Sequence, residues 1–320
     1  MRHCASGAAC PYWRKNMLKY TLSRILIALL TLWVLVTATF FLVKLLPGDP
    51  FMNDKVPAAI QERQREYYGL NKPVIVQYFT YMNNLLHGDL GYSLKTSGRA
   101  VIDVIKDFFP VSAKLGIISM VIFDFLGILC GIICAQNRGK WPDYLLLIFA
   151  VVCVALPSMV VGPVLRYFLG AKWKLLPVAG WGKAKQIILP ALILGLSAFA
   201  GYTRSMRASM LSVMSEDYIK TAQAKGLSNA QIILRHELKN AFVPIMSNLG
   251  ISIASILTGT FVVEDMFLIP GLGRHFTNSI IALDYPLVMG LTIFFGAFLI
   301  TMNMLVDVLY GVVDPRIRTR

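Results

Sequence analysis

The chain has 320 residues, of which 56% are hydrophobic and only 15% are charged, and its formal net charge is +14. A soluble domain of this length needs far more polar surface, so the composition excludes a soluble globular protein and indicates one that lies in lipid. The sequence contains no aromatic-interleaved basic patch and no nucleic-acid motif. We therefore attribute the positive charge to loops that face anionic lipid.

Six apolar stretches are long enough to span a membrane. The fourth is the weakest, at about 17 residues, which is the lower limit for a hydrocarbon core of ~30 Å. The stretches occupy residues 23–46, 112–135, 144–169, 187–203, 243–263 and 287–310. The expected fold is an all-α integral membrane protein with six transmembrane helices.

Residues 1–16 show neither periodicity nor an apolar stretch, whereas the residues from Met17 onward are typical of the N-terminus of a membrane protein. We expect residues 1–16 to be a disordered leader, and interpret them as an extension from an upstream start codon. The first apolar stretch is too long for a signal-peptide core and lacks a small-residue cleavage site. Residues 17–46 are therefore expected to be a retained N-terminal anchor and first transmembrane helix.

The distribution of Lys and Arg predicts that both termini are cytoplasmic. Cations gather before the first span, in the loops after the second and fourth spans, and in the tail at 313–320. With an even number of spans, these four segments share one side. The loop at 170–186 argues against this orientation, because it would be external and yet carries Lys172, Lys174, Lys183 and Lys185.

The expected external loop, residues 47–110, contains two helical patterns. A short helix is predicted near 57–68, with Pro57 at its start and Gly69 past its end. A second, amphipathic helix covers 74–86 and stops at His87-Gly88. Its apolar face suits either the membrane surface or the helix bundle. Residues 111–312 form the expected five-helix core.

The expected cytoplasmic loop, residues 204–242, contains two short helices with a break. Asp217 is a candidate N-cap, and the first helix continues to Lys225. Gly226 suits the left-handed residue that ends such a helix. A capping box of Ser228 and Gln231 predicts a second helix over 229–239, after which Pro244 opens the next span. Small side chains on a short exposed helix would let another protein approach closely.

This stretch resembles the coupling loop, or EAA loop, of bacterial ATP-binding-cassette (ABC) importer permeases. That loop has the pattern Glu-Ala-Ala, three residues, then Gly. Aligned on Gly226, this chain has Lys220, Thr221 and Ala222, so two of the three positions depart from it. The departures match the peptide branch of the family, which reads like RTAxAKGLS followed by RHxLxNA.

The resemblance extends over nearly the whole chain after Met17. It includes LLPGDPF at 45–51, IPGLGR at 269–274, LDYPLVMG at 283–290 and NMLVDVLYGVVDPRIR at 303–318. The motifs are together similar to the first, B-type permease subunit of oligopeptide, dipeptide and nickel importers. The resemblance implies a type I importer transmembrane domain with a cytoplasmic coupling helix between the fourth and fifth spans.

The resemblance also implies partners: a homologous second permease, two ATPase subunits and an extracytoplasmic substrate-binding protein that docks on the outer loops. The chain has no nucleotide-binding motif, so ATP and Mg would be bound by the ATPase subunits, with no cofactor, metal or catalytic residue in this chain. The residues expected to contact the ATPase are Asp217, Tyr218, Thr221, Ala222, Ala224, Lys225, Gly226 and Leu227.

Other readings stay open at this point. Importers of nickel or glutathione belong to the same branch. An ion-coupled secondary transporter would use Asp124, an acidic residue within the second span, but would also show internal inverted repeats, which the sequence lacks. Asp124 could instead pair with Lys114 or a hydroxyl, or belong to a helix interface. A membrane-embedded hydrolase would need a nucleophile or metal constellation that is not present.

Overall fold

A computed structural model describes residues 11–45, 62, 66, 69, 71–93 and 98–313 of the chain. Within these ranges, the side chains of residues 11–21, 247–251, 253–260 and 306–313 are not described. The predicted short helix near 57–68 therefore lies mostly outside the described residues, as do residues 1–10 of the expected leader and residues 314–320 of the tail.

The described residues form helices with one isolated bridge, between Tyr92 and Ala100, and no strand. The helices are α1 (Pro11–Leu45), α3 (Val74–Leu86), α4 (Val101–Gln136), α5 (Trp141–Ala155), α6 (Ser158–Leu165), η1 (Arg166–Lys172), α7 (Ala184–Met214), α8 (Asp217–Ala224), α9 (Asn229–Ile232), η2 (Ile233–Glu237), α10 (Leu238–Met266), α11 (Leu272–Ile281) and α12 (Tyr285–Val313). The all-α fold is as predicted. Helix α1 begins at Pro11, so Met17 is not a helix boundary.

Four helices are long and apolar enough to cross a membrane, within Leu22–Leu45, Val101–Gln136, Ala184–Met214 and Tyr285–Leu305. A fifth span is possible if the bent pair Trp141–Ala155 and Ser158–Lys172 is taken as one. Helix α10 covers the predicted fifth stretch, but much of its side-chain structure is not described. The count of six therefore stays a prediction.

The predicted third span, 144–169, is not one straight helix. It breaks after Ala155, and the two parts are bent by 104°. Leu156 is extended, with φ −94° and ψ 117°, and Pro157 follows it. A proline disfavours the helical conformation of the preceding residue and cannot donate a backbone hydrogen bond, so the helix ends there.

The predicted fourth span, 187–203, is longer than expected. Helix α7 runs for 31 residues to Met214 and includes Arg204 and Arg207. The segment predicted as a loop at 204–242 is therefore helical over its first eleven residues. Charged side chains suggested a loop, but a long helix can carry them beyond the hydrocarbon region.

Helices α4 and α7 pack closely because glycine lines their contact. A Cβ atom at Gly127 would lie 2.6 Å from the Phe199 carbonyl oxygen, and one at Gly131 would lie 2.6 Å from the Met206 Cβ. Two glycines four residues apart let helix backbones approach within a membrane. Helix α5 also packs against both α4 and α7, so the three helices form one group.

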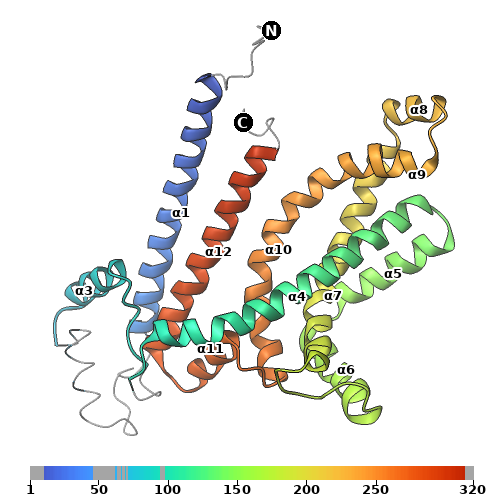
Figure 1. The fold of residues 1–320 in the computed structure, drawn as a ribbon. Helices are drawn as coiled ribbons and strands as arrows, with labels where there is room; N and C mark the ends of the chain where they lie inside the picture. Colours follow the sequence, from blue (N-terminus) through green and yellow to red (C-terminus); the bar gives the residue numbers. More distant parts are fainter. Residues whose placement is uncertain are drawn as a thin grey trace.

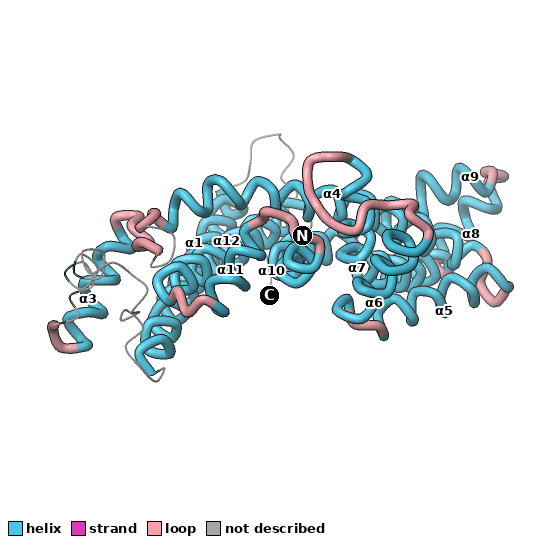
Figure 2. The backbone as a smooth tube through the Cα atoms, turned by 90° about the horizontal axis from the view of Figure 1, so that it is seen from below, coloured by secondary structure: helices cyan, strands magenta, loops and turns pink. Residues whose placement is uncertain are grey.

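Figure 1 shows that the first turn of α1, the last turn of α12 and the α8–α9 protrusion lie at one end of the molecule. Helices α3, α11 and α6 lie at the other end. Figure 2, from below, shows an elongated arrangement with α1, α12 and α3 toward one side and α5, α8 and α9 toward the other. We call the end with α8 the coupling end, and the opposite end the outer end.

Helix α3 ends at Leu86, as predicted, with His87 as its C-cap and Gly88 at φ +80°. Its Tyr81 is buried against α1 and α12, with Phe40 and Met289 in the same cluster. Other apolar side chains of α3, among them Ile75 and Phe79, are exposed. One face therefore packs on the bundle while the other is open.

Candidate functional site

The first helix of the coupling loop, α8, spans Asp217–Ala224. Its N-cap is Glu216, which has extended backbone angles and whose carbonyl oxygen accepts from the Ile219 amide at 3.1 Å. Asp217, the predicted cap, is thus the first helical residue, and the observed cap lies one position earlier. There it still adds negative charge to the first turn, where the helix dipole favours it.

The break after α8 is the left-handed turn that the sequence predicts. Gly226 has φ +76°, and its amide donates to the Gln223 carbonyl oxygen at 2.9 Å. No atom lies within 4 Å of a Cβ built at this glycine. Glycine is therefore needed here for backbone conformation and not for space within this chain.

The second helix begins as predicted but does not end as predicted. The Ser228 hydroxyl accepts from the Gln231 amide at 3.4 Å, and the Gln231 side chain accepts from the Ser228 amide at 3.1 Å, which forms the capping box. Helical structure then continues through η2 into α10. Pro244 lies inside α10 and does not open it.

The predicted contact residues do not share one environment. Ala222 is only 4% exposed and packs with Ile219 and Ile232 inside the loop. Asp217, Tyr218, Thr221, Ala224, Lys225 and Gly226 are exposed, and Leu227 is half-buried. Ala222 therefore holds the two helices of the loop together and is not available to a partner. We call the exposed set Asp217, Tyr218, Thr221, Ala224 and Lys225 the knob face.

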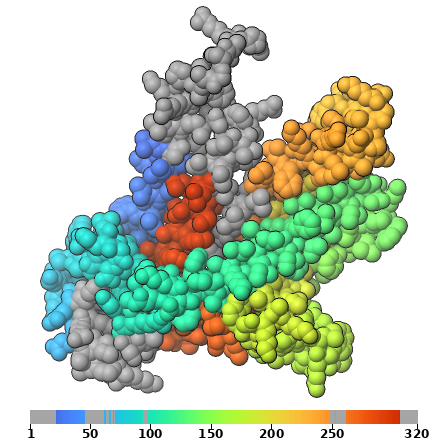
Figure 3. Space-filling view, in the orientation of Figure 1, coloured from blue at the N-terminus to red at the C-terminus, as the bar shows by residue number. Residues whose placement is uncertain are grey.

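Tyr218 joins the knob to α10, because its hydroxyl accepts a hydrogen bond from Asn240 Nδ2 at 3.0 Å. Figure 3 shows α8 and α9, in orange, protruding at one corner of the molecule. A protrusion that is tied back to a long helix can transmit a push along that helix.

Two buried carboxylates fix the base of the knob. The Glu237 carboxylate accepts from Gln136 Nε2 at 2.8 Å, which links η2 to the last residue of α4. Burial raises the pKa of Glu237 above its usual value, and the Gln136 hydrogen bond opposes this effect. No local sequence pattern predicts this pair, because its residues are 101 positions apart.

The second carboxylate, Asp143, is 1% exposed. Arg207 Nε and Nη2 donate to its Oδ1 and Oδ2, both at 2.7 Å, and the Gly139 amide donates to Oδ2 at 3.0 Å. The bidentate pair fastens the start of α5 to α7. Sequence reasoning counted Arg207 as a loop cation and missed its partner, which is 64 residues away.

Asp124, the candidate within the second span, is 4% exposed on α4. Its carboxylate lies near the Tyr202 hydroxyl, which bonds to Ser252 Oγ at 2.9 Å. Neither Asp124 oxygen makes a hydrogen bond of good geometry to a described residue. Lys114 is exposed and does not pair with it. The position is a helix interface between α4 and α7.

The outer end also holds buried carboxylates. Glu264, on α10, accepts from the Arg274 amide at 3.1 Å, and the Ser112 hydroxyl accepts from the Leu272 amide at 2.8 Å. Both bonds provide acceptors for backbone amides in the first turn of α11, which have no acceptor within the helix. A Cβ at Gly271 would overlap the Glu264 carboxylate. The IPGLGR motif therefore forms a tight turn that seats α11 against α10 and α4.

Asp284 has the same role at α12. Ser93 Oγ donates to its Oδ2 at 2.5 Å, and the Leu287 amide donates to its Oδ1 at 3.5 Å. The carboxylate sits just before the helix begins at Tyr285. Asp284 thus joins the segment after α3 to the start of α12, which explains the aspartate in LDYPLVMG.

A family model described as "Binding-protein-dependent transport system inner membrane component" matches residues 127–319, and the model of its N-terminal part matches residues 17–116. The chain is 41% identical over 305 residues to the oligopeptide transport system permease protein OppB of Haemophilus influenzae, covering 94% of this chain and 100% of that protein. It is 39% identical over 303 residues to the dipeptide transport system permease protein DppB of Bacillus subtilis, covering 94% and 98%.

Among solved structures, the inward-facing MetNI methionine ABC transporter matches with a TM-score of 0.52 and 13% identity, covering 68% of this chain and 98% of that chain. At this identity the likeness shows the fold alone, which is that of a type I importer transmembrane domain. The family models cover nearly all of the chain after Met17. The chain therefore belongs to the binding-protein-dependent transport system inner membrane components, a family of multi-pass inner-membrane permeases.

Proposed function

We propose that this chain is a permease subunit of an ABC importer that carries oligopeptides or dipeptides across the inner membrane. The observation that carries the proposal is the full-length similarity to OppB and DppB proteins, whose printed names are those of oligopeptide and dipeptide permeases. The repeats expected of a secondary transporter are absent from the sequence.

The chain would act with partners: a homologous second permease that completes the pathway, two ATPase subunits and an external binding protein. The family's description supports dependence on a binding protein. ATP and Mg would be held by the ATPase subunits, and this chain would perform no catalysis. Its own task would be to change shape when the ATPases do.

The knob face is where we place the contact with the ATPase. The knob face consists of four exposed side chains of α8 and that of Lys225, its C-cap, and Gly226 exposes backbone beside it. Movement of α8 would pass to α10 through the Tyr218–Asn240 bond, to α4 through Glu237–Gln136, and through buried packing of Ala241 and Ile245 against Met206 and Met210 of α7.

Transport by the complete complex tests the proposal. The chain and its partners are reconstituted in liposomes with an isotope-labelled tripeptide and the binding protein on the outer side. We expect accumulation that requires ATP and is unchanged by ionophores. Accumulation that ionophores abolish in the presence of ATP would support the ion-coupled alternative. Competition by unlabelled nickel or glutathione, but not by peptides, would refute the peptide assignment.

The orientation that we propose places the coupling end in the cytoplasm and the outer end outside. The first and last membrane-crossing helices support this orientation, since α1 begins and α12 ends at the same end of the molecule as α8 (Figure 1). In a cysteine-free background, we expect Lys183→Cys to react with a membrane-impermeant maleimide in intact spheroplasts. Lys225→Cys should react only after the membrane is opened. The reverse pattern would refute the orientation.

A further inference from the structure

The segment between Asp143 and Glu216 contains no acidic residue, although it contains many cations. Five of these cluster between α6 and the first residues of α7: Arg166, Lys172, Lys174, Lys183 and Lys185. In the orientation proposed above, the cluster lies outside, where the positive-inside rule disfavours Lys and Arg. Membrane topology therefore does not explain why these cations cluster here. The inference that follows rests on the proposed orientation.

The cations lie on a bent element that we call the elbow, residues 158–175. Helix α6 and η1 turn by 104° away from α5, so they no longer run along the bundle. Figure 3 shows the elbow, in yellow-green, protruding at the outer end of the molecule. Its exposed apolar side chains are Met159, Val160, Val164, Tyr167, Phe168, Trp173 and Leu175.

Aromatic and cationic side chains alternate at the tip of the elbow. Lys172 Nζ lies 5.4 Å from the Phe168 ring centroid, and the Phe168 and Trp173 centroids are 5.7 Å apart. Trp173 is 55% exposed. Within the described part of the chain, no carboxylate pairs with Lys172, Lys174, Lys183 or Lys185. The tip thus offers positive charge beside rings that suit the membrane–water boundary.

A cavity of ≈ 370 Å³ opens beside this tip, lined by Pro163, Arg166, Tyr167, Ala171 and Val178. Arg166 and Tyr167 are the only lining residues with polar side-chain groups. Arg166 Nη1 donates to the Met266 carbonyl oxygen at 2.5 Å, while its other nitrogens bond to no described residue. A polar group bound at the mouth would meet a half-buried cation with spare donors, and an apolar tail could enter the cavity.

We propose that the elbow binds an anionic phospholipid of the outer leaflet, with the phosphate held by Arg166, Lys172 and Lys174 and part of an acyl chain in the cavity. An anionic phospholipid matches both the cations and the apolar side chains of this surface, because it has a negatively charged headgroup and hydrocarbon chains. Clusters of cations next to membrane-embedded helices attract anionic lipid at about 1 kcal/mol, or about fivefold in affinity, for each Lys or Arg near the surface.

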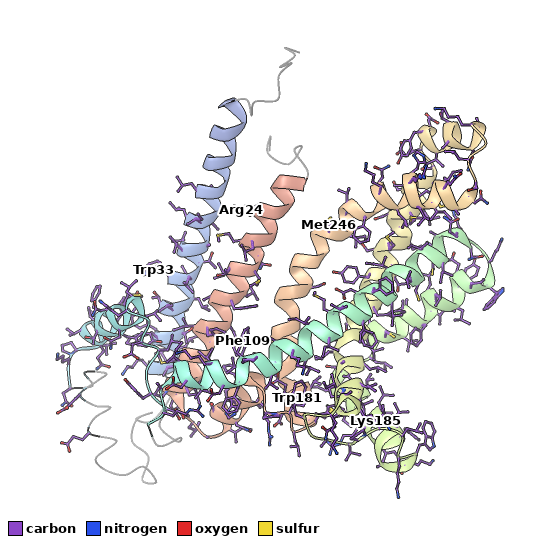
Figure 4. The ribbon with its side chains drawn as sticks, in the orientation of Figure 1. Arg24, Trp33, Phe109, Trp181, Lys185 and Met246 are labelled. Atoms are coloured by element: carbon purple, nitrogen blue, oxygen red, sulfur yellow. The ribbon has the colours of Figure 1, made fainter. Side chains whose placement is uncertain are left out.

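Two observations favour lipid over a docked protein. Exposed apolar side chains continue from the elbow onto α5, including Leu145, Ile148 and Val152, so the surface is contiguous with one that suits hydrocarbon. Moreover, the elbow is fixed to the external end of α10, since Arg166 Nη1 donates to the Met266 carbonyl oxygen. The loop after the elbow is held at the same place, because the Gly180 amide donates to the Phe267 carbonyl oxygen at 2.9 Å. Figure 4 labels Trp181 on the loop that follows and Lys185 in the first turn of α7, both at the outer end. A bound lipid would therefore hold this end of α10 at a fixed depth in the membrane.

Lipid retention tests the proposal without any transport assay. The complex is purified from bilayers of equal phosphatidylglycerol and phosphatidylcholine, and the lipids that remain bound are counted by native mass spectrometry. We expect preferential retention of phosphatidylglycerol. Lys172→Gln with Lys174→Gln should lower that preference at least fivefold. Lys72→Gln with Lys106→Gln, which removes two exposed lysines elsewhere on the outer side, should leave it unchanged.

An unchanged preference in Lys172→Gln/Lys174→Gln would overturn the proposal, as would an equal loss in the control pair. If the elbow variant kept its lipid but bound the binding protein more weakly, the surface would be a protein-docking site and the lipid assignment would be wrong. A complex that retains phosphatidylglycerol at the elbow yet moves no peptide would refute the proposed function while leaving this inference intact.

Discussion

The two ends of the molecule both bury carboxylates, but they use them differently. At the coupling end, Asp143 and Glu237 accept from side chains of other helices, Arg207 and Gln136. At the outer end, Glu264 and Asp284 accept from backbone amides at the starts of α11 and α12, and Asp284 also accepts from the Ser93 hydroxyl. The first arrangement joins helices that lie far apart in sequence into one block, whereas the second fixes how the chain enters a helix.

This difference fits the tasks that we propose for the two ends. A knob that receives force needs rigid links to several helices, and paired side chains supply them across α4, α5, α7 and α10. The outer end needs defined helix starts around a substrate entrance. Each of the following variants breaks one kind of contact. Their effects on stability and uptake show whether the contacts at the two ends differ in energetic contribution as well as in geometry.

Arg207→Ala should have the largest effect, because it leaves the Asp143 carboxylate buried without its cation. Removing one partner of a buried pair costs about 3–5 kcal/mol, so we expect a marked fall in the melting temperature of the purified complex and loss of uptake. Adding Asp143→Asn should restore part of the stability, since the amide carries no charge. Lys220→Ala is the control: its ion pair with Asp217 is exposed, and its loss should leave the melting temperature close to wild type. Equal effects of the two alanine variants would show that the buried pair has no special role.

Gly271→Ala tests the outer end. The added methyl would overlap the Glu264 carboxylate and crowd the Ser112 hydroxyl, which would disturb the first turn of α11. Overpacking of this kind costs about 1–3 kcal/mol, measurable as a lower melting temperature. Gly201→Ala on α7 is the matched control, because nothing lies within 4 Å of the new Cβ. The helix should then gain up to about 1 kcal/mol. A stable Gly271→Ala protein would mean that Glu264 does not seat α11 in this way.

Gly226→Val should have the smallest effect on stability but a large one on transport. The left-handed backbone, φ +76°, costs about 1–2 kcal/mol for a residue with a Cβ, and that strain stays local because no neighbour is displaced. We expect normal membrane insertion with uptake abolished, and Gly226→Asn should retain more uptake than Gly226→Val, because Asn tolerates this conformation. Uptake by Gly226→Val at the wild-type rate would show that transport does not depend on this turn. Ala222→Trp should also abolish uptake, but by breaking its packing on Ile232.

Local features of the fold were predictable because their causes are local. The turn at Gly226, the capping box of Ser228 and Gln231, and the end of α3 at His87 each depend on a few neighbouring residues. The bend at Leu156-Pro157 was missed because a hydropathy window averages over a single proline. The length of α7 was missed because Arg204 and Arg207 suggest a loop.

The candidate site was only partly predictable. Its residues were placed on α8 through family resemblance, but the sequence could not show that Ala222 faces inward, since a small residue suits either a protein interface or a tight internal contact. The pairs Asp143–Arg207 and Gln136–Glu237 join residues 64 and 101 positions apart. Contacts at such separation depend on how helices pack, which no local pattern specifies.

Cross-linking from α8 to the ATPase subunit tests the central claim most directly. In a cysteine-free background, Thr221→Cys, Ala224→Cys and Ala222→Cys each carry a short photoactivatable maleimide in the assembled complex. We predict that Thr221→Cys and Ala224→Cys, on the knob face, form a covalent adduct with the ATPase. Ala222→Cys should give little or none, because Ala222 is only 4% exposed. Absence of ATPase adducts from both exposed positions would contradict the account, because the knob face would then not be the surface through which ATP hydrolysis drives this permease.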